Sequence, residues 1–277
     1  MDITGFALVT GGASGIGNAT CRALARAGAR GIMVADINLE GAKKAVSEAQ
    51  DVATNPAFKA LAVHLDVTIE ESVKHAVAYM VDSFGRMDYC IHCAAIPGGT
   101  FDELSSADFA DFKHLLEVNV QGTFLVTSNV LAAMRAQELK QLHSTSPERG
   151  TTRGCLVNMA SLLSYKALPG MVQYVTSKHA VMGISTTAET TAVENVGHDI
   201  RVNCVCPSYV DTAMVRRATE VVAGLEQTIL SGIPMGRLAS AEEIADIALF
   251  LCSPMSSYMT GCGLVADGGM SLFFGSR

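Results

Sequence analysis

The stretch Thr10-Gly11-Gly12-Ala13-Ser14-Gly15-Ile16-Gly17 decides the fold of this chain. A short apolar run at 6–10 precedes it and a helical pattern at 16–27 follows, so the glycines form a turn between a strand and a helix. Glycines there let the backbone approach a pyrophosphate, and the free N–H groups of the helix N-terminus attract its negative charge. The spacing is GxxxGxG. We therefore expect a dinucleotide-binding unit at the start of the chain.

Apolar runs alternate with helical patterns along the rest of the chain. Further strands are expected at 31–35, 60–65, 88–92, 155–159, 200–206 and 263–266. Further helices are expected at 39–53, 69–84, 107–139, 172–194 and 241–252. Strands that are apolar throughout and separated by helices are typical of a parallel sheet with helices on both faces. We expect one α/β domain over 1–277, with an exposed loop at 143–153 and a lid or helical excursion at 207–237.

Composition narrows the classes of function. The chain has 277 residues, 49% of them hydrophobic and 17% charged, which is enough to bury a substantial core. The net charge of −7 argues against nucleic acid and anionic membranes as partners. No apolar run reaches the roughly 18 to 20 residues of a membrane span, and no basic region precedes an apolar N-terminal core. We expect a soluble, cytoplasmic protein.

The eight cysteines do not predict a metal site. Cys90 and Cys93 spell CxxC, but residues three apart on a strand point to opposite faces of its sheet. No second pair follows at zinc spacing. We interpret the cysteines as small core residues and expect no metal.

Two carboxylates follow expected strands. Asp36 lies 19 residues after Gly17, where a carboxylate accepts hydrogen bonds from the adenosine ribose and repels a 2′-phosphate. No Arg or Lys stands beside it in Asp36-Ile37-Asn38, so NAD is favoured over NADP. Asp66, in Asp66-Val67, is placed to reach the adenine edge. The alternative for each is that it caps the helix that follows.

Polar residues with catalytic chemistry occur later in the chain. Tyr174 and Lys178 are four residues apart in a helical pattern and share a face. Ser161 follows the strand at 155–159, and Asn119 lies inside the expected helix 107–139. Ends of parallel strands converge on one crevice, where open α/β sheets bind their ligands.

This combination resembles the short-chain dehydrogenase/reductase family, with its TGxxxGxG and YxxxK motifs, over nearly the whole chain. The resemblance implies a single Rossmann domain with a seven-stranded parallel sheet and hydride transfer between nicotinamide and an alcohol or ketone carbon. It also implies a catalytic tetrad of Asn119, Ser161, Tyr174 and Lys178. Tyr174 would be the acid/base, and Lys178 with the positive nicotinamide would favour its phenolate. Ser161 would hold the substrate oxygen, and Asn119 a water that links Lys178 to solvent.

The resemblance also assigns a cofactor site, with two departures from the family pattern. The expected contacts are Gly11, Ser14, Gly15, Ile16, Gly17, Asp36, Ile37, Asp66, Val67, Ala94, Asn119, Tyr174, Lys178, Pro207, Val210 and Thr212. Ser208 stands where the family has glycine after proline. Ile91-His92-Cys93-Ala94-Ala95 replaces the usual Asn-Asn-Ala-Gly, which removes a sheet-stabilising asparagine. We interpret His92 as a buried, hydrogen-bonded histidine.

Apolar residues in the lid predict a lipophilic substrate, such as a terpenoid, steroid or polyketide skeleton. Expected substrate contacts are Ser161, Leu163, Tyr174 and Met214. The alternative is that these apolar side chains only pack the lid helices down. NAD favours alcohol oxidation, and the helices at 107–139 and 172–194 suit the interface of a homotetramer or dimer. Rival functions are a non-redox isomerase, dehydratase or cyclase, and a silent nucleotide sensor, which would not need Tyr174 with Lys178.

Overall fold

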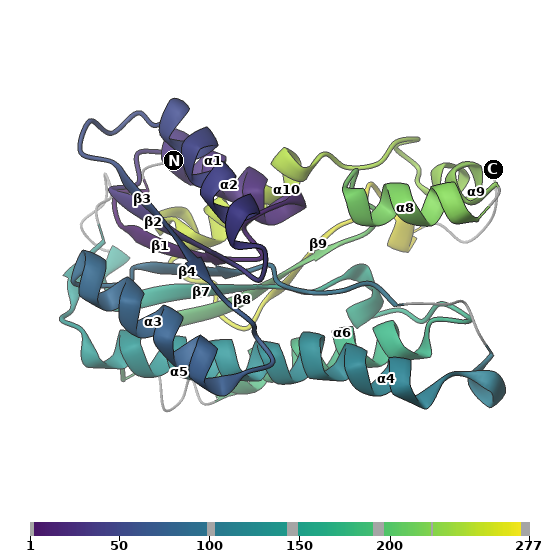
Figure 1. Cartoon of the computed structure of the whole chain (residues 1–277). Helices are drawn as coiled ribbons and strands as arrows, with labels where there is room; N and C mark the ends of the chain where they lie inside the picture. Colours follow the sequence, from purple (N-terminus) through teal and green to yellow (C-terminus); the bar gives the residue numbers. More distant parts are fainter. Residues whose placement is uncertain (1–2, 99–102, 143–148, 191–196, 223, 273–277) are drawn as a thin grey trace.

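The computed structural model describes residues 3–98, 103–142, 149–190, 197–222 and 224–272 (Figure 1). Seven strands form one sheet in the order β3-β2-β1-β4-β7-β8-β9, and every neighbouring pair is parallel. They are β1 (Phe6–Thr10), β2 (Gly31–Asp36), β3 (Lys59–His64), β4 (Tyr89–His92), β7 (Gly154–Met159), β8 (Ile200–Pro207) and β9 (Gly263–Ala266). The strand order reverses between β1 and β4, which confirms the doubly wound sheet.

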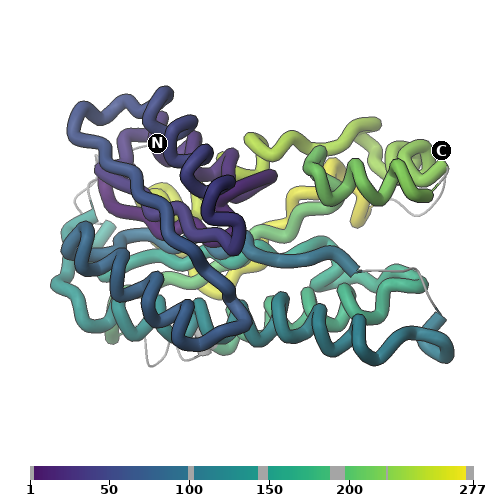
Figure 2. The backbone as a smooth tube through the Cα atoms, in the orientation of Figure 1, coloured from purple at the N-terminus to yellow at the C-terminus, as the bar shows by residue number. Residues whose placement is uncertain are grey.

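Helices cover both faces of this sheet (Figure 1). One layer contains α1 (Gly15–Arg26), α2 (Leu39–Asp51) and α10 (Ala241–Cys252). The other contains α3 (Glu70–Phe84), α4 (Phe109–Leu116), α5 (Gly122–Ala136) and α6 (Val172–Thr190). Figure 2 shows α8 (Ala213–Val221) and α9 (Leu225–Gly232) beyond the same end of the sheet as α4 and part of α6, with the two sets on opposite sides of its plane. The stretch 207–237 is therefore a helical excursion.

Alternation along the strands divides the core into two parts. In β7, Cys155, Val157 and Met159 pack with α1 and α10, whereas Leu156 packs with α3 and α5. Cys90 belongs to the second core and Cys93 packs against the first, so the CxxC thiols point apart, as expected. Among the described residues, no three His, Cys, Asp or Glu side chains are grouped to hold a metal. No described helix is both long and apolar enough to cross a bilayer.

The helix expected at 107–139 is wrong in two respects. It is interrupted by a π-helical segment, η2 (Glu117–Gln121), between α4 and α5, and it ends at Ala136. The loop expected at 143–153 is partly a hairpin, since β5 (Lys140–Gln141) pairs antiparallel with β6 (Thr151–Thr152). Two-residue polar strands carry no periodicity, so the sequence gives no sign of them. Residues 143–148, and 191–194 of the helix expected at 172–194, lie outside the described residues.

Candidate active site

The glycine turn leaves backbone groups free for a phosphate. Ser14, the N-cap of α1, has extended backbone and makes no side-chain capping bond, so the first N–H groups of α1 keep their capacity for a ligand. Gly11 has φ +64°, and a Cβ there would lie 2.7 Å from the Ala94 nitrogen. A Cβ on Gly17 would overlap the Gly11 carbonyl. This tight cradle fits the pyrophosphate of a dinucleotide.

Asp36 lies directly beside this turn. Its carboxylate accepts hydrogen bonds from Ala13 N (3.0 Å) and Asn38 N (2.9 Å). The cap of α2 is Asn38, which accepts from Gly41 N at 3.0 Å, so the alternative that Asp36 caps this helix is wrong. The two amide bonds fix the carboxylate while each oxygen keeps a lone pair for a ribose hydroxyl.

Asp66 shapes the turn after β3. Its Oδ1 accepts from Thr68 N (2.9 Å) and Thr68 Oγ1 (2.7 Å). Because α3 has Ile69 as its N-cap, Asp66 is not the cap of this helix either. Its contact with adenine stays a prediction.

Ser161, Tyr174 and Lys178 meet at the carboxyl end of β7. The Ser161 hydroxyl lies close enough to the Tyr174 hydroxyl to lower its pKa, and the Lys178 ammonium lies 5.5 Å from the centre of the Tyr174 ring. Lys178 Nζ also donates to Met159 O, the last residue of β7, at 3.0 Å. Leu163 N donates to Ser161 Oγ at 3.1 Å and fixes the serine side chain. The structure brings these three predicted catalytic residues together.

Burial controls the charge of this cluster. It raises the pKa of Tyr174 to about 12, although the hydrogen bond from Ser161 acts in the opposite direction. Burial also lowers the pKa of Lys178 to about 8. Desolvation therefore outweighs the stabilisation of the phenolate that was expected from Lys178. In the protein without cofactor, Tyr174 is a neutral phenol at neutral pH.

Asn119 lies in the π-helical segment and ties the chain after β4 to α6. Its Oδ1 accepts from Ile96 N at 2.9 Å, and its Nδ2 donates to Ile96 O at 3.0 Å and to Ser177 Oγ at 3.2 Å. Both amide hydrogens are therefore used within the protein. A water that links Lys178 to solvent would have to bind the remaining lone pair of Oδ1. This role stays a prediction.

His92 is buried and hydrogen-bonded at both ring nitrogens, as expected. Its Nδ1 lies 2.7 Å from Thr10 Oγ1 and its Nε2 lies 3.1 Å from Thr123 Oγ1. Thr123 donates its hydroxyl hydrogen to Asn119 O at 2.6 Å, so this hydroxyl accepts from His92 Nε2–H. Nδ1 then carries no proton and accepts from Thr10. A directed chain of hydrogen bonds therefore links the strand before the glycine turn to Asn119.

For the remaining residues expected to contact cofactor or substrate, the structure gives their position and exposure. Thr212 is the N-cap of α8, its hydroxyl lies 3.4 Å from Val210 O, and its methyl would lie 3.4 Å from a Cβ on Gly15. Pro207 ends β8, Ile37 is 65% exposed, and Val67 is buried. Leu163 is half-buried and Met214 is 38% exposed, and their contact with substrate stays a prediction.

Sequence reasoning missed several polar contacts among and near these residues. Thr10 and His92 are register partners across β1 and β4, so a correct strand pairing would have joined them. Ser177 links Asn119 to Tyr174 O, to which it donates at 2.8 Å. Gln173 is buried, and its Nε2 has no hydrogen-bond partner among the described residues. Nothing in the sequence around Gln173 signals this.

Comparison with known proteins agrees with this geometry. A family model described as enoyl-(acyl carrier protein) reductase matches residues 11–271. The chain is 50% identical over 272 residues to short-chain dehydrogenase fogB of Aspergillus ruber (strain CBS 135680), with 98% of each chain covered. It is 37% identical over 264 residues to 2,5-dichloro-2,5-cyclohexadiene-1,4-diol dehydrogenase of Sphingobium indicum (strain B90A), covering 95% of this chain and 96% of that one. The crystal structure of levodione reductase superimposes with a TM-score of 0.86 at 28% identity, covering 99% of this chain and 100% of the other.

The fold and the site define a Rossmann-fold oxidoreductase of the kind that uses a nicotinamide cofactor. The chain belongs to the short-chain dehydrogenase/reductase family.

Proposed function

We propose that this protein transfers a hydride between NAD and the secondary alcohol or ketone carbon of a lipophilic ring compound. One observation carries the proposal. Ser161, Tyr174 and Lys178 meet at the carboxyl end of β7, with the Lys178 ammonium against the Tyr174 ring, at the same edge of the sheet as the glycine turn. A proton donor and a dinucleotide cradle at one edge are what carbonyl reduction and alcohol oxidation require.

The cofactor, when bound, supplies or accepts the hydride. In reduction, Tyr174 Oη–H gives its proton to the carbonyl oxygen while Ser161 Oγ–H stabilises the charge that develops there. Lys178 and Ser161 then stabilise the phenolate left behind. In oxidation the same groups act in reverse, and Tyr174 must first lose its proton.

NAD is proposed over NADP because of the position of Asp36. Ala13 N and Asn38 N fix its carboxylate at the end of β2, beside the turn. A 2′-phosphate would meet this negative charge without a basic residue in Asp36-Ile37-Asn38 to offset it.

The substrate class is proposed from the surroundings of Tyr174 and from two relatives. Gly98 packs beside Tyr174, because a Cβ built on Gly98 would lie 3.5 Å from the Cβ of Tyr174. Next to Tyr174, the proposed substrate site is therefore bounded by a residue without a side chain. Gly99, the neighbour of Gly98, lies outside the described residues. One relative is named for a cyclohexadiene diol and one structural neighbour for levodione. A terpenoid, steroid or polyketide-like ring fits this setting. NAD favours oxidation, whereas the raised pKa of Tyr174 favours proton donation, as in reduction.

We also propose a homo-oligomer, dimer or tetramer, formed through α4, α5 and α6. Phe109 of α4 is 75% exposed and Phe124 of α5 is 58% exposed. Large exposed aromatic side chains on neighbouring helices are typical of an interface. The expected cytoplasmic location stays a prediction.

The decisive experiment is a hydride-transfer assay in both directions, with NAD and hydrophobic secondary alcohols and with reduced NAD and the matching ketones. The absorbance of reduced nicotinamide measures the reaction. Tyr174→Phe should lower kcat by about 100- to 10,000-fold, the usual contribution of general acid–base catalysis. Its affinity for the cofactor should stay within a few-fold. Tyr258→Phe, at a fully exposed tyrosine, is the matched control and should change neither value.

The outcomes separate the rival functions. Turnover that survives Tyr174→Phe refutes the role of the phenol. Cofactor binding without turnover of any alcohol or ketone supports the sensor, and conversion of substrate without net change in the cofactor supports an isomerase, dehydratase or cyclase.

A further inference from the structure

Two cysteines meet at the edge of the sheet opposite the active site. Cys155 is the second residue of β7 and Cys252 is the last residue of α10. Each is 2% exposed and both belong to the same core. Cys155 is the register partner of Tyr89 and of Arg201 near the starts of β4 and β8, so the pair lies at the amino ends of these strands.

Hydrogen bonds give the two thiols different chemistry. An interaction with Cys252, together with the nearby Arg201 guanidinium, lowers the pKa of Cys155 against the effect of burial, whereas the pKa of Cys252 is raised. The neutral Cys155 thiol donates to Leu251 O at 3.2 Å. Arg201 Nη2 donates to the same carbonyl at 2.8 Å, so this carbonyl keeps a partner when Cys155 ionises. Burial raises the pKa of Cys90, which packs in the other core.

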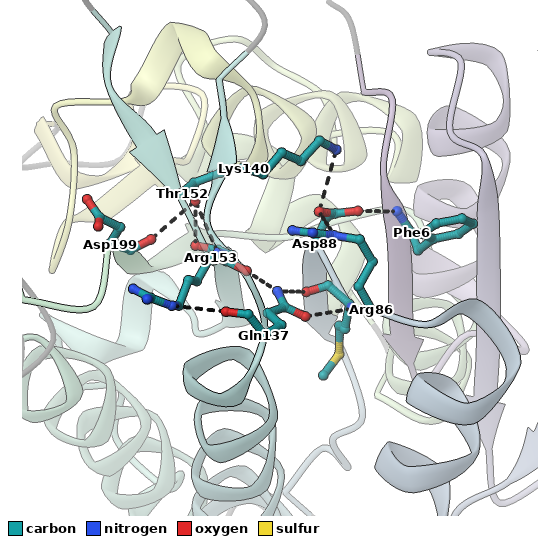
Figure 3. Close-up of polar contacts among 10 residues, drawn as sticks. Phe6, Arg86, Asp88, Gln137, Lys140, Thr152, Arg153 and Asp199 are labelled. Atoms are coloured by element: carbon teal, nitrogen blue, oxygen red, sulfur yellow. Dashed lines mark hydrogen bonds and ion pairs between the residues drawn. The ribbon is translucent and has the colours of Figure 1, made fainter.

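Both cysteines line a small cavity. Arg201, Lys140 and Asp88 also line it, and about 20 Å³ of it is open to a molecule the size of water. A cavity needs about 10–15 Å³ by this measure to hold one water. Figure 3 shows Lys140 reaching across to Asp88, to which it forms an ion pair at 3.5 Å. The cavity therefore has room for about one molecule the size of water beside the two cysteines and none for a thiol peptide.

We propose that Cys155 and Cys252 form a peroxide-reactive pair that closes into a disulfide between β7 and α10. The Cys155 thiolate attacks one oxygen of hydrogen peroxide, the O–O bond breaks, and the hydroxide released takes up a proton to become water. Cys155 is then a sulfenic acid. The Cys252 sulfur attacks it, the S–S bond forms, the S–O bond breaks, and the departing hydroxide leaves as water with the proton of Cys252. Two thiols are oxidised and one peroxide is reduced.

The test uses the full-length reduced protein. It is treated with hydrogen peroxide, its remaining thiols are alkylated, and it is digested without reductant for mass spectrometry. The expected product is one cross-linked peptide pair that contains Cys155 and Cys252, lighter by two hydrogens than the reduced peptides and released by dithiothreitol. Recovery of both cysteines as alkylated thiols, their separate oxidation to sulfinic acids, or a cross-link between other cysteines overturns the proposal.

Variants sharpen the assignment. In Cys252→Ala the sulfenic acid of Cys155 has no thiol to consume it, so dimedone labelling of Cys155 should rise several-fold over the native protein. Cys90→Ala is the matched control, and it should form the same cross-link at the same rate. Equal dimedone labelling of Cys155 in the native protein and in Cys252→Ala contradicts the attack by Cys252. The cross-link in the native protein decides the proposal even if Cys252→Ala does not fold.

Discussion

A single carboxylate, Asp36, carries the proposed choice of cofactor, and its replacement tests this at the scale of one residue. Asp36→Ala should weaken NAD binding by about tenfold or more, since a hydrogen bond to a charged group contributes about 1.5–3 kcal/mol. It should also improve NADP binding, because the charge that repels a 2′-phosphate is gone. Fluorescence titration with both reduced cofactors measures the two dissociation constants. Glu40→Gln, at an exposed charge in the first turn of the following helix α2, is the control, and an unchanged preference in Asp36→Ala would contradict the ribose contact.

His92 adds a prediction about pH. Burial lowers its pKa from 6.5 to about 3, with Lys178 acting in the same direction. The unfolded chain therefore binds a proton between pH 6.5 and 3 that the folded protein does not, so this contribution to stability is present above pH 6.5 and is lost as the pH falls. The loss reaches about 5 kcal/mol below about pH 3, at about 1.4 kcal/mol per pH unit.

Urea unfolding at a series of pH values measures this effect. His92→Asn, which keeps a polar side chain without a titrating ring, should be less sensitive to acid over the same range. Nitrogen-15 NMR of the native protein should show the neutral Nε2–H tautomer at pH 6 to 8. A protonated ring, or the Nδ1–H tautomer, would contradict the hydrogen-bond chain from Thr10 to Asn119.

Among the elements, the turn between β1 and α1 tolerates no added side chain. Gly17→Ala places a methyl group against the Gly11 carbonyl, so the turn must open and its N–H groups lose their alignment. We expect cofactor affinity to fall by at least about tenfold, measured by calorimetry with NAD. Gly197→Ala is the control, because a Cβ there meets nothing within 4 Å at an ordinary φ, and it should bind NAD normally. Native affinity in Gly17→Ala would show that the cofactor does not use this cradle.

Elements with strong patterns were predictable from the sequence, and those set by tertiary contacts were not. The buried strands read as continuous apolar runs because helices cover both faces of the sheet, so all seven were found. The π-helical segment at Asn119 was missed, because Val118 and Val120 continue an ordinary helical pattern. This segment contains Asn119, whose side chain is hydrogen-bonded to Ile96 and Ser177. These partners come together only in the assembled fold.

The same division holds for the site. Ser161, Tyr174 and Lys178 follow from motif spacing, since a strand end and one helix face fix their places. The raised pKa of Tyr174 could not be predicted from the spacing, because the burial that causes it is a property of the packed molecule. Asp36 was found from its position at the end of β2, but only the structure shows that Asn38 caps α2 and leaves the Asp36 carboxylate at the turn.

For the molecule as a whole, the two edges of the sheet have separate tasks. The carboxyl edge holds the proposed hydride transfer, whereas the amino edge is held by a polar cluster around Asp88 (Figure 3). Asp88 is 4% exposed and accepts from Phe6 N at 2.9 Å and from Arg86 Nε at 2.7 Å. Gln137 at the end of α5 donates to Met87 O at 2.8 Å and accepts from Met87 N at 3.0 Å. This edge therefore joins β1, β4 and α5.

If the edges are independent, damage to the amino edge should lower stability without lowering activity. Asp88→Ala leaves Phe6 N–H and Arg86 without their partner, and we expect a loss of about 3 kcal/mol, the lower end for a broken buried ion pair because Arg86 keeps access to water. Urea unfolding measures this, and kcat at a temperature where the variant stays folded should match the native value. Asp82→Ala, at an exposed carboxylate on α3, is the control and should change neither quantity. A fall in kcat with unchanged stability would mean that Asp88 communicates with Tyr174 across the sheet, because the amino edge would then act on the chemistry rather than on the fold.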